Sequence, residues 1–126
     1  MQHNPVVWFE IYVQDMARAK AFYEAMLGLK LQPLGPPGES TLEMWAFPGE
    51  ATHMGSGGAL VRFEGVPSGC GGTLVYFHCE DCAVEAARAQ EAGGQLHREK
   101  MSIGPYGFIA LVNDTEGNLI GLHSMA

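Results

Sequence analysis

Glu10 is the residue of this 126-residue chain whose type and position best suit chemistry. In the segment 7–13, apolar residues alternate with Trp8, Glu10 and Tyr12. This alternation predicts a β-strand with one wholly apolar face, and it places Glu10 on the other face between two aromatic side chains. A carboxylate that is partly desolvated on such a face is suited to take or give a proton as a general base or acid.

Two histidines lie on comparable faces of later segments. Leu74, Tyr76 and His78 alternate with apolar neighbours, and His123 shares its parity with Gly121 near the end of the chain. An imidazole at such a position can transfer a proton or donate a hydrogen bond to a substrate oxyanion.

Each of these candidates also has a purely structural interpretation. Glu10 could pair with Arg62 or with an ordered water, His78 could bond a neighbouring backbone carbonyl, and His123 could be a solvated chain end. Trp8 and Tyr76 could be ordinary core residues.

The three cysteines favour structure over chemistry. Cys79 and Cys82 have the spacing of half a zinc or redox motif, but Cys70 is isolated and no second pair exists. We interpret Cys79 as a buried strand thiol and Cys82 as a thiol in the first turn of a helix.

The elements that position these residues occur twice. Each copy has a strand that ends in an aspartate, then an alanine-rich helix and a glycine before the next strand, and Asp15 matches Asp81 at the same offset at which Gly28 matches Gly94. The aspartates are suited to cap the helices and the glycines to end them. The second helix is expected over 83–92, and further strands are expected near 29–34, 41–47, 58–63, 95–99, 106–112 and 118–124.

This order of strands and helices predicts an α+β fold made of two βαβββ modules, with helices on only one face of the sheet. We expect a single domain in which modules 1–64 and 72–126 are joined by the glycine-rich linker 65–71. The net charge of −7 and the absence of a basic cluster disfavour nucleic acids and anionic membranes as partners. The N-terminus lacks the order of a signal peptide and no apolar run could cross a bilayer, so we expect a cytoplasmic protein.

These motifs together resemble the vicinal oxygen chelate superfamily, which includes glyoxalase I, bleomycin resistance protein and extradiol dioxygenases. The resemblance covers nearly the whole chain and is closest to the glyoxalase-like subgroup. Its carriers are Trp8-Phe9-Glu10-Ile11 before Asp15, Ala19-x-x-Phe22-Tyr23, Leu27-Gly28, Tyr76-Phe77-His78-x-x-Asp81, Gly93-Gly94 and Asp114-x-x-Gly117-Asn118-x-Ile120-Gly121-Leu122.

The resemblance implies a half-open barrel with a small-molecule pocket on its concave face. Relatives hold a divalent metal there and chelate two substrate oxygens with it. Their metal ligands correspond to Trp8, Leu74, Gly121 and a position near Ala59 or Val61, none of which offers a donor. No metal is therefore expected at the usual positions, although Glu10, His78 and His123 form a two-histidine, one-carboxylate set that could hold one elsewhere.

The residues that alternate onto the concave face implied by this resemblance are the candidates for the remaining roles. Glu10, His78 and His123 are the candidate catalytic residues; the ligand-binding residues would be Trp8, Tyr12, Leu74 and Tyr76, with Tyr106 and Phe108 as an aromatic lid. The function is then either a lyase or isomerase that uses Glu10, or a non-catalytic protein that sequesters a small, antibiotic-like compound. A metal-dependent dioxygenase with a relocated site is the third alternative. A homodimer is expected because half-open sheets leave edges to cover.

Overall fold

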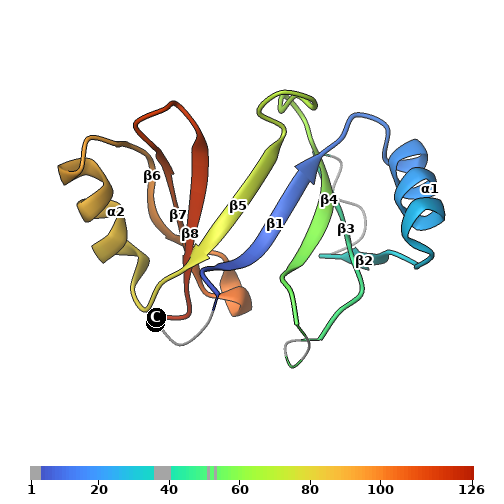
Figure 1. Ribbon diagram of the computed structural model, residues 1–126, viewed down its shortest axis with the longest axis horizontal. Helices are drawn as coiled ribbons and strands as arrows, with labels where there is room; N and C mark the ends of the chain where they lie inside the picture. The colour runs from blue at the N-terminus through green and yellow to red at the C-terminus, as the bar shows by residue number, and fades with distance from the viewer. Residues whose placement is uncertain (1–3, 36–40, 51, 53) are drawn as a thin grey trace. The chain divides into compact units, whose positions relative to one another are not determined.

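The computed structural model describes residues 4–35, 41–50, 52 and 54–126, and it confirms the predicted α+β class and the two βαβββ modules (Figure 1). The elements in chain order are β1 (Val6–Tyr12), α1 (Met16–Leu27), β2 (Gln32–Leu34), β3 (Leu42–Ala46), β4 (Gly57–Phe63), β5 (Thr73–His78), α2 (Cys82–Glu91), β6 (Gln95–Ser102), a short 3-10 helix (Gly104–Tyr106), β7 (Phe108–Asn113) and β8 (Leu119–Ser124). Among the described residues, no helix is long and apolar enough to span a membrane.

The chain forms two compact units with the same internal topology. The first unit comprises Trp8–Thr73, and the second comprises the chain up to Val7 together with Leu74–Ala126. In the first unit the strand order is β2-β3-β4-β1, with β4 parallel to β1 and antiparallel to β3. In the second unit the order is β6-β7-β8-β5, with β8 parallel to β5 and antiparallel to β7. The internal repeat seen in the sequence is therefore a repeat of topology.

Both helices begin at the predicted aspartates. The Asp15 carboxylate accepts a hydrogen bond from the Arg18 backbone N–H at 3.0 Å, and the Asp81 carboxylate accepts one from the Ala83 N–H at 3.1 Å. Each cap satisfies a backbone donor that the first helical turn leaves without a partner.

The helix ends differ, which corrects the predicted equivalence of Gly28 and Gly94. Gly28 ends α1 in the left-handed conformation, with φ 66°. In the second unit it is Gly93 that has a positive φ, of 104°. The Gly94 N–H donates to the Ala89 carbonyl at 2.8 Å. Gly94 is needed for space instead, because a Cβ there would lie 2.7 Å from the Asn113 carbonyl oxygen.

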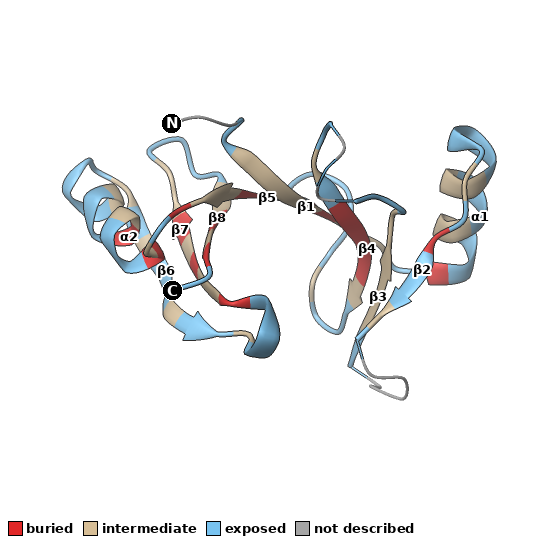
Figure 2. Cartoon of the chain, turned by 90° about the horizontal axis from the view of Figure 1, so that it is seen from below, coloured by how far each residue is buried: buried red, intermediate tan, exposed pale blue. Residues whose placement is uncertain are grey.

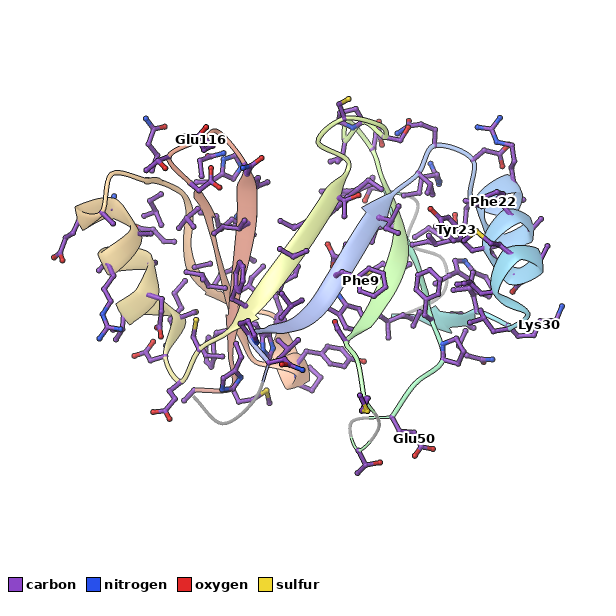
Figure 3. All side chains as sticks on the ribbon, viewed as in Figure 1. Phe9, Phe22, Tyr23, Lys30, Glu50 and Glu116 are labelled. Atoms are coloured by element: carbon purple, nitrogen blue, oxygen red, sulfur yellow. The ribbon has the colours of Figure 1, made fainter. Side chains whose placement is uncertain are left out.

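Each unit has its own core on the helix side of its strands. The buried residues of the first unit's core are Met16, Leu31 and Leu60, and those of the second are Cys79, Cys82, Ala86, Ala110, Val112 and Leu122. Figure 2 shows buried residues on strands such as β4 and β7, and Figure 3 shows Phe9 beside β1 and β4, with Tyr23 nearer α1. Cys79 and Cys82 are both buried, as expected; Cys82 lies in the first turn of α2, whereas Cys79 follows the last residue of β5.

Two strands begin at least two residues later than predicted, for local reasons. The strand expected over 29–34 begins only at Gln32, because the Leu31 N–H donates to the Glu24 carboxylate at 2.9 Å instead of pairing with a strand. The strand expected from Tyr106 begins at Phe108, since Tyr106 ends a 3-10 helix and Gly107 follows it with φ 103°.

Candidate functional site

Glu10 is the centre of a hydrogen-bonded group on the face of β1 that points away from α1. Its side chain is almost completely buried, with 9% exposure. The Trp8 indole N–H donates to its Oε2 at 3.2 Å, and the Tyr12 hydroxyl donates to its Oε1 at 2.7 Å. The three side chains are neighbours because residues two apart in a strand point to the same face. We call Trp8, Glu10 and Tyr12 the carboxylate clasp.

The alternative in which Glu10 pairs with Arg62 is wrong. Strand register places Ala59 beside Glu10, and Arg62 has the opposite parity to Ala59 along β4. Its guanidinium Nε instead contacts the Glu43 carboxylate at 3.4 Å, and the Trp45 indole donates to the same carboxylate at 3.0 Å. Within the described part of the chain, no lysine or arginine forms an ion pair with Glu10.

The carboxylate clasp leaves acceptor sites of Glu10 unused. An ionised carboxylate has about four acceptor sites, of which the clasp uses one on each oxygen. A further hydrogen bond or a proton can therefore still be accepted by either oxygen. The sequence placed Trp8 and Tyr12 on this face but did not show that they bond Glu10; their spacing of two residues was the only available signal.

His78 and His123 are direct cross-strand neighbours in the second unit. They form a register pair between the parallel strands β5 and β8, so their side chains start from the same face. The His123 Nε2 lies 2.6 Å from the Tyr106 carbonyl oxygen. Because a carbonyl can only accept, this nitrogen carries the hydrogen, and a neutral His123 ring presents Nδ1 as an acceptor. His123 is half-buried, and its ring is held by this bond to Tyr106.

Tyr76 lies over Gly121, which pairs with it across β5 and β8. A side chain at Gly121 would overlap the Tyr76 ring, so the ring occupies the space that a residue with a donor group would fill. Leu74 and Tyr76 are both buried on the face that also carries His78. Their roles in ligand binding remain predictions.

The two residues of the predicted aromatic lid lie in different environments. Tyr106 is exposed in the 3-10 helix and its carbonyl holds His123. Phe108 packs against the core beneath α2, and the Lys100 ammonium lies 4.7 Å from its ring centre. Phe108 lies on the side of the strands that faces α2. This position does not support a binding surface that Phe108 would share with His123.

The residues at the superfamily's metal positions do not fit a metal. Trp8, Leu74 and Gly121 offer no ligand atom, and the register of β1 with β4 identifies Ala59 as the fourth position, because it pairs with Glu10 as Gly121 pairs with Tyr76. Ala59 is wholly buried and has no donor either. In the described residues, no three or more His, Cys, Asp or Glu side chains are grouped so that they could hold a metal ion. A relocated site formed by Glu10, His78 and His123 stays a prediction.

Two shallow hollows lie elsewhere on the first unit. One surrounds the end of α1 near Gly28 and Lys30, and the other lies beside its start near Asp15 and Phe22. Neither is lined by a predicted site residue, so the carboxylate clasp remains the candidate site of the first unit and the histidine pair that of the second.

Comparison with known protein families gives a match over part of the chain. Residues 6–41 match a family model described as bleomycin resistance protein-like N-terminal. No curated protein matches the chain. The family match covers less than half of the chain and agrees with the bleomycin resistance branch of the resemblance.

Several solved structures share the fold at low identity. A hypothetical protein from Bacillus halodurans superposes with a TM-score of 0.69 at 15% identity, covering 94% of this chain and 92% of its own. Methylmalonyl-CoA epimerase from Mycobacterium tuberculosis gives 0.64 at 20% identity, with 97% and 88% coverage. A variant of the Streptomyces coelicolor epimerase in complex with 2-nitronate-propionyl-CoA gives 0.66 at 18% identity, with 98% of each chain covered.

Proposed function

We propose that this protein is a small-molecule enzyme of the lyase or isomerase kind, in which Glu10 exchanges a proton with a carbon atom of its substrate. One observation carries the proposal: Glu10 is buried, and among the described residues it is held by the neutral donors Trp8 and Tyr12 and not by a cation. A buried carboxylate is ordinarily retained as one partner of an ion pair. Here its position is fixed and it can still accept a proton, which are the requirements for a general base.

The chemistry proposed for Glu10 is proton transfer next to a carbonyl group. The carboxylate takes the proton, and the electron pair of the broken C–H bond moves toward the adjacent carbonyl. Return of a proton completes an isomerisation, whereas departure of a neighbouring group completes an elimination. The epimerases among the structural neighbours make methylmalonyl-CoA a reasonable first compound to test. No step is assigned to a metal at the superfamily's usual positions, since Trp8, Leu74, Gly121 and Ala59 cannot bind one.

Exchange in heavy water tests the proposal directly. The protein is incubated in D2O with methylmalonyl-CoA and a set of small ketones and keto acids, and deuterium uptake is followed by NMR. We expect catalysed exchange at one carbon, and we expect Glu10→Gln to slow it by about 10²- to 10⁴-fold while leaving the affinity almost unchanged.

A non-catalytic binding protein is the second candidate, and the match to the bleomycin resistance protein-like model favours it. In that case Glu10 would serve as a counter-charge for a cationic ligand. Calorimetric titration with bleomycin separates the two functions: a binder shows no exchange with any compound, and Glu10→Gln weakens its affinity.

A further inference from the structure

We infer that Tyr12 acts with Glu10 as an acid–base pair, in which Glu10 takes a proton from a substrate carbon and Tyr12 gives its phenolic proton to the neighbouring carbonyl oxygen. The inference rests on the proposed function and narrows its substrate. The substrate must carry a hydrogen on the carbon next to a carbonyl, and that carbonyl must be able to become an enol.

The two donors in the carboxylate clasp are not chemically equivalent. An indole N–H can donate a hydrogen bond but cannot accept one in return, whereas a phenol can do both and can give up its proton. The Tyr12 hydroxyl lies 2.7 Å from Oε1, an ordinary distance for a hydrogen bond between two oxygens. The Trp8 nitrogen is 3.2 Å from Oε2. Of the two, only Tyr12 can exchange a proton with Glu10.

The step balances without a further reagent. The substrate proton moves to a Glu10 oxygen, the C–H electron pair forms a carbon–carbon double bond, and the carbonyl π electrons move onto its oxygen. That oxygen takes the phenolic proton of Tyr12. The Tyr12 oxygen then recovers a proton from the Glu10 carboxyl group along their existing hydrogen bond. A carbonyl compound has become an enol, and both side chains are as they began.

The surroundings of the pair favour such a relay. The register of β1 with β4 places Ala59 beside Glu10 and Val61 beside Tyr12, and both of these residues are almost wholly buried and apolar. In a site with little water, a second charge would be costly. The relay keeps a single negative charge on the pair and the substrate throughout, so no second charge is created.

A matched pair of variants separates proton donation from simple positioning. Tyr12→Phe and Trp8→Phe each remove one hydrogen bond to Glu10 and keep an aromatic ring. If Tyr12 gives a proton, we expect Tyr12→Phe to slow deuterium exchange in α-hydroxyketones and methylmalonyl-CoA by about 100-fold or more, and Trp8→Phe by less than about tenfold. In a pH–rate profile, the activity of the unaltered protein should also fall at alkaline pH, where a phenol ionises. The profile of Tyr12→Phe should lack this alkaline limb.

Equal losses in the two variants would overturn the inference and leave Tyr12 as a positioning residue. Absence of the alkaline limb in the unaltered protein would overturn it too, and this measurement decides the question even if Tyr12→Phe does not fold. A protein that exchanges none of the compounds, or whose Glu10→Gln variant is as fast as the original, refutes the proposed function itself. An active protein that depends on Glu10 but not on Tyr12 refutes only the relay.

Discussion

At Glu10, one strand supplies both the carboxylate and the two groups that hold it. Trp8 stands at a position where the resemblance implies a metal ligand, and its indole instead donates a hydrogen bond to Oε2. Tyr12 donates to Oε1 from the other side. Because all three side chains belong to β1, their geometry depends on one regular element and on no loop. A site on a strand is held more firmly than one on a connection, which suits a group that must meet a particular atom of a substrate.

The cysteines give a prediction about reactivity. Burial, followed by the charge of Glu85, raises the pKa of Cys79 to about 12. Cys82 is also buried, whereas Cys70 is exposed. Since the thiolate is the reactive form, we expect a thiol reagent at pH 8 to modify Cys70 alone in the native protein and all three cysteines after denaturation.

Mass spectrometry of the labelled protein checks this result, and Cys70→Ser is the control, because it should abolish native labelling. Rapid modification of Cys79 or Cys82 in the folded chain would show that the core beneath α2 opens readily.

The Asp81 carboxylate predicts a pH dependence of stability. Its hydrogen bond to Lys100, at 2.8 Å, and then the bond from the Ala83 N–H hold the pKa of Asp81 below its ordinary value. A depressed folded-state pKa contributes stability above the unfolded pKa, about 4, and this contribution is lost as pH falls through the folded value. We expect Asp81→Asn to lower the melting temperature at pH 7 and to make little difference at the lowest pH at which the protein folds.

Asp15→Asn is the matched control, since Asp15 caps α1 by a similar bond and forms no ion pair among the described residues. Its effect should therefore include no contribution from a salt bridge. Equal pH dependence in the two variants would contradict a contribution from Lys100.

The ends of the two helices give a prediction at the scale of elements. Gly28 needs a left-handed backbone and has open space around it, whereas Gly94 needs space beside the Asn113 and Ala89 carbonyl oxygens. Asparagine tolerates the left-handed conformation better than alanine does. We therefore expect Gly28→Asn to cost less stability than Gly28→Ala, and Gly94→Asn to cost at least as much as Gly94→Ala, which should lose about 1–3 kcal/mol.

Urea unfolding of the four variants measures these differences in the free energy of unfolding. The variant with the higher free energy of unfolding should be asparagine at position 28 and alanine at position 94. The same order at both would mean that the two glycines serve one purpose after all.

Secondary structure could be predicted from the sequence where neighbouring residues alone determine it, as in strand alternation and helix capping. The alternation in 7–13 fixed the faces of β1, and Asp15 and Asp81 fixed the starts of the helices. The sequence could not distinguish the roles of Gly28 and Gly94, because the difference lies in the carbonyl of Asn113 on β7, a contact made only on folding. The short β2 likewise depends on the bond between Leu31 and Glu24.

At the scale of the whole molecule, the repeat was predictable and the contacts of the site were not. Equal spacing of aspartates and glycines indicated two modules, and the strand orders of the two units agree with that. The partner of Arg62 depends on which strands β4 adjoins, and β3 brings it Glu43. The packing of Phe108 beneath α2 depends in the same way on pairing between distant segments. The homodimer stays a prediction.

The two separate cores predict which strands a core substitution will destabilise. Leu60 is wholly buried in the core of the first unit, and Leu122 is 6% exposed in the core of the second. Replacing either leucine by alanine should cost about 2–5 kcal/mol. Local opening follows contiguous cooperative units. We therefore expect Leu60→Ala to accelerate amide hydrogen exchange mainly in β3 and β4, and Leu122→Ala mainly in β7 and β8. If each substitution accelerated exchange equally in both units, the chain would unfold as one cooperative body, and the repeat would be a feature of topology alone.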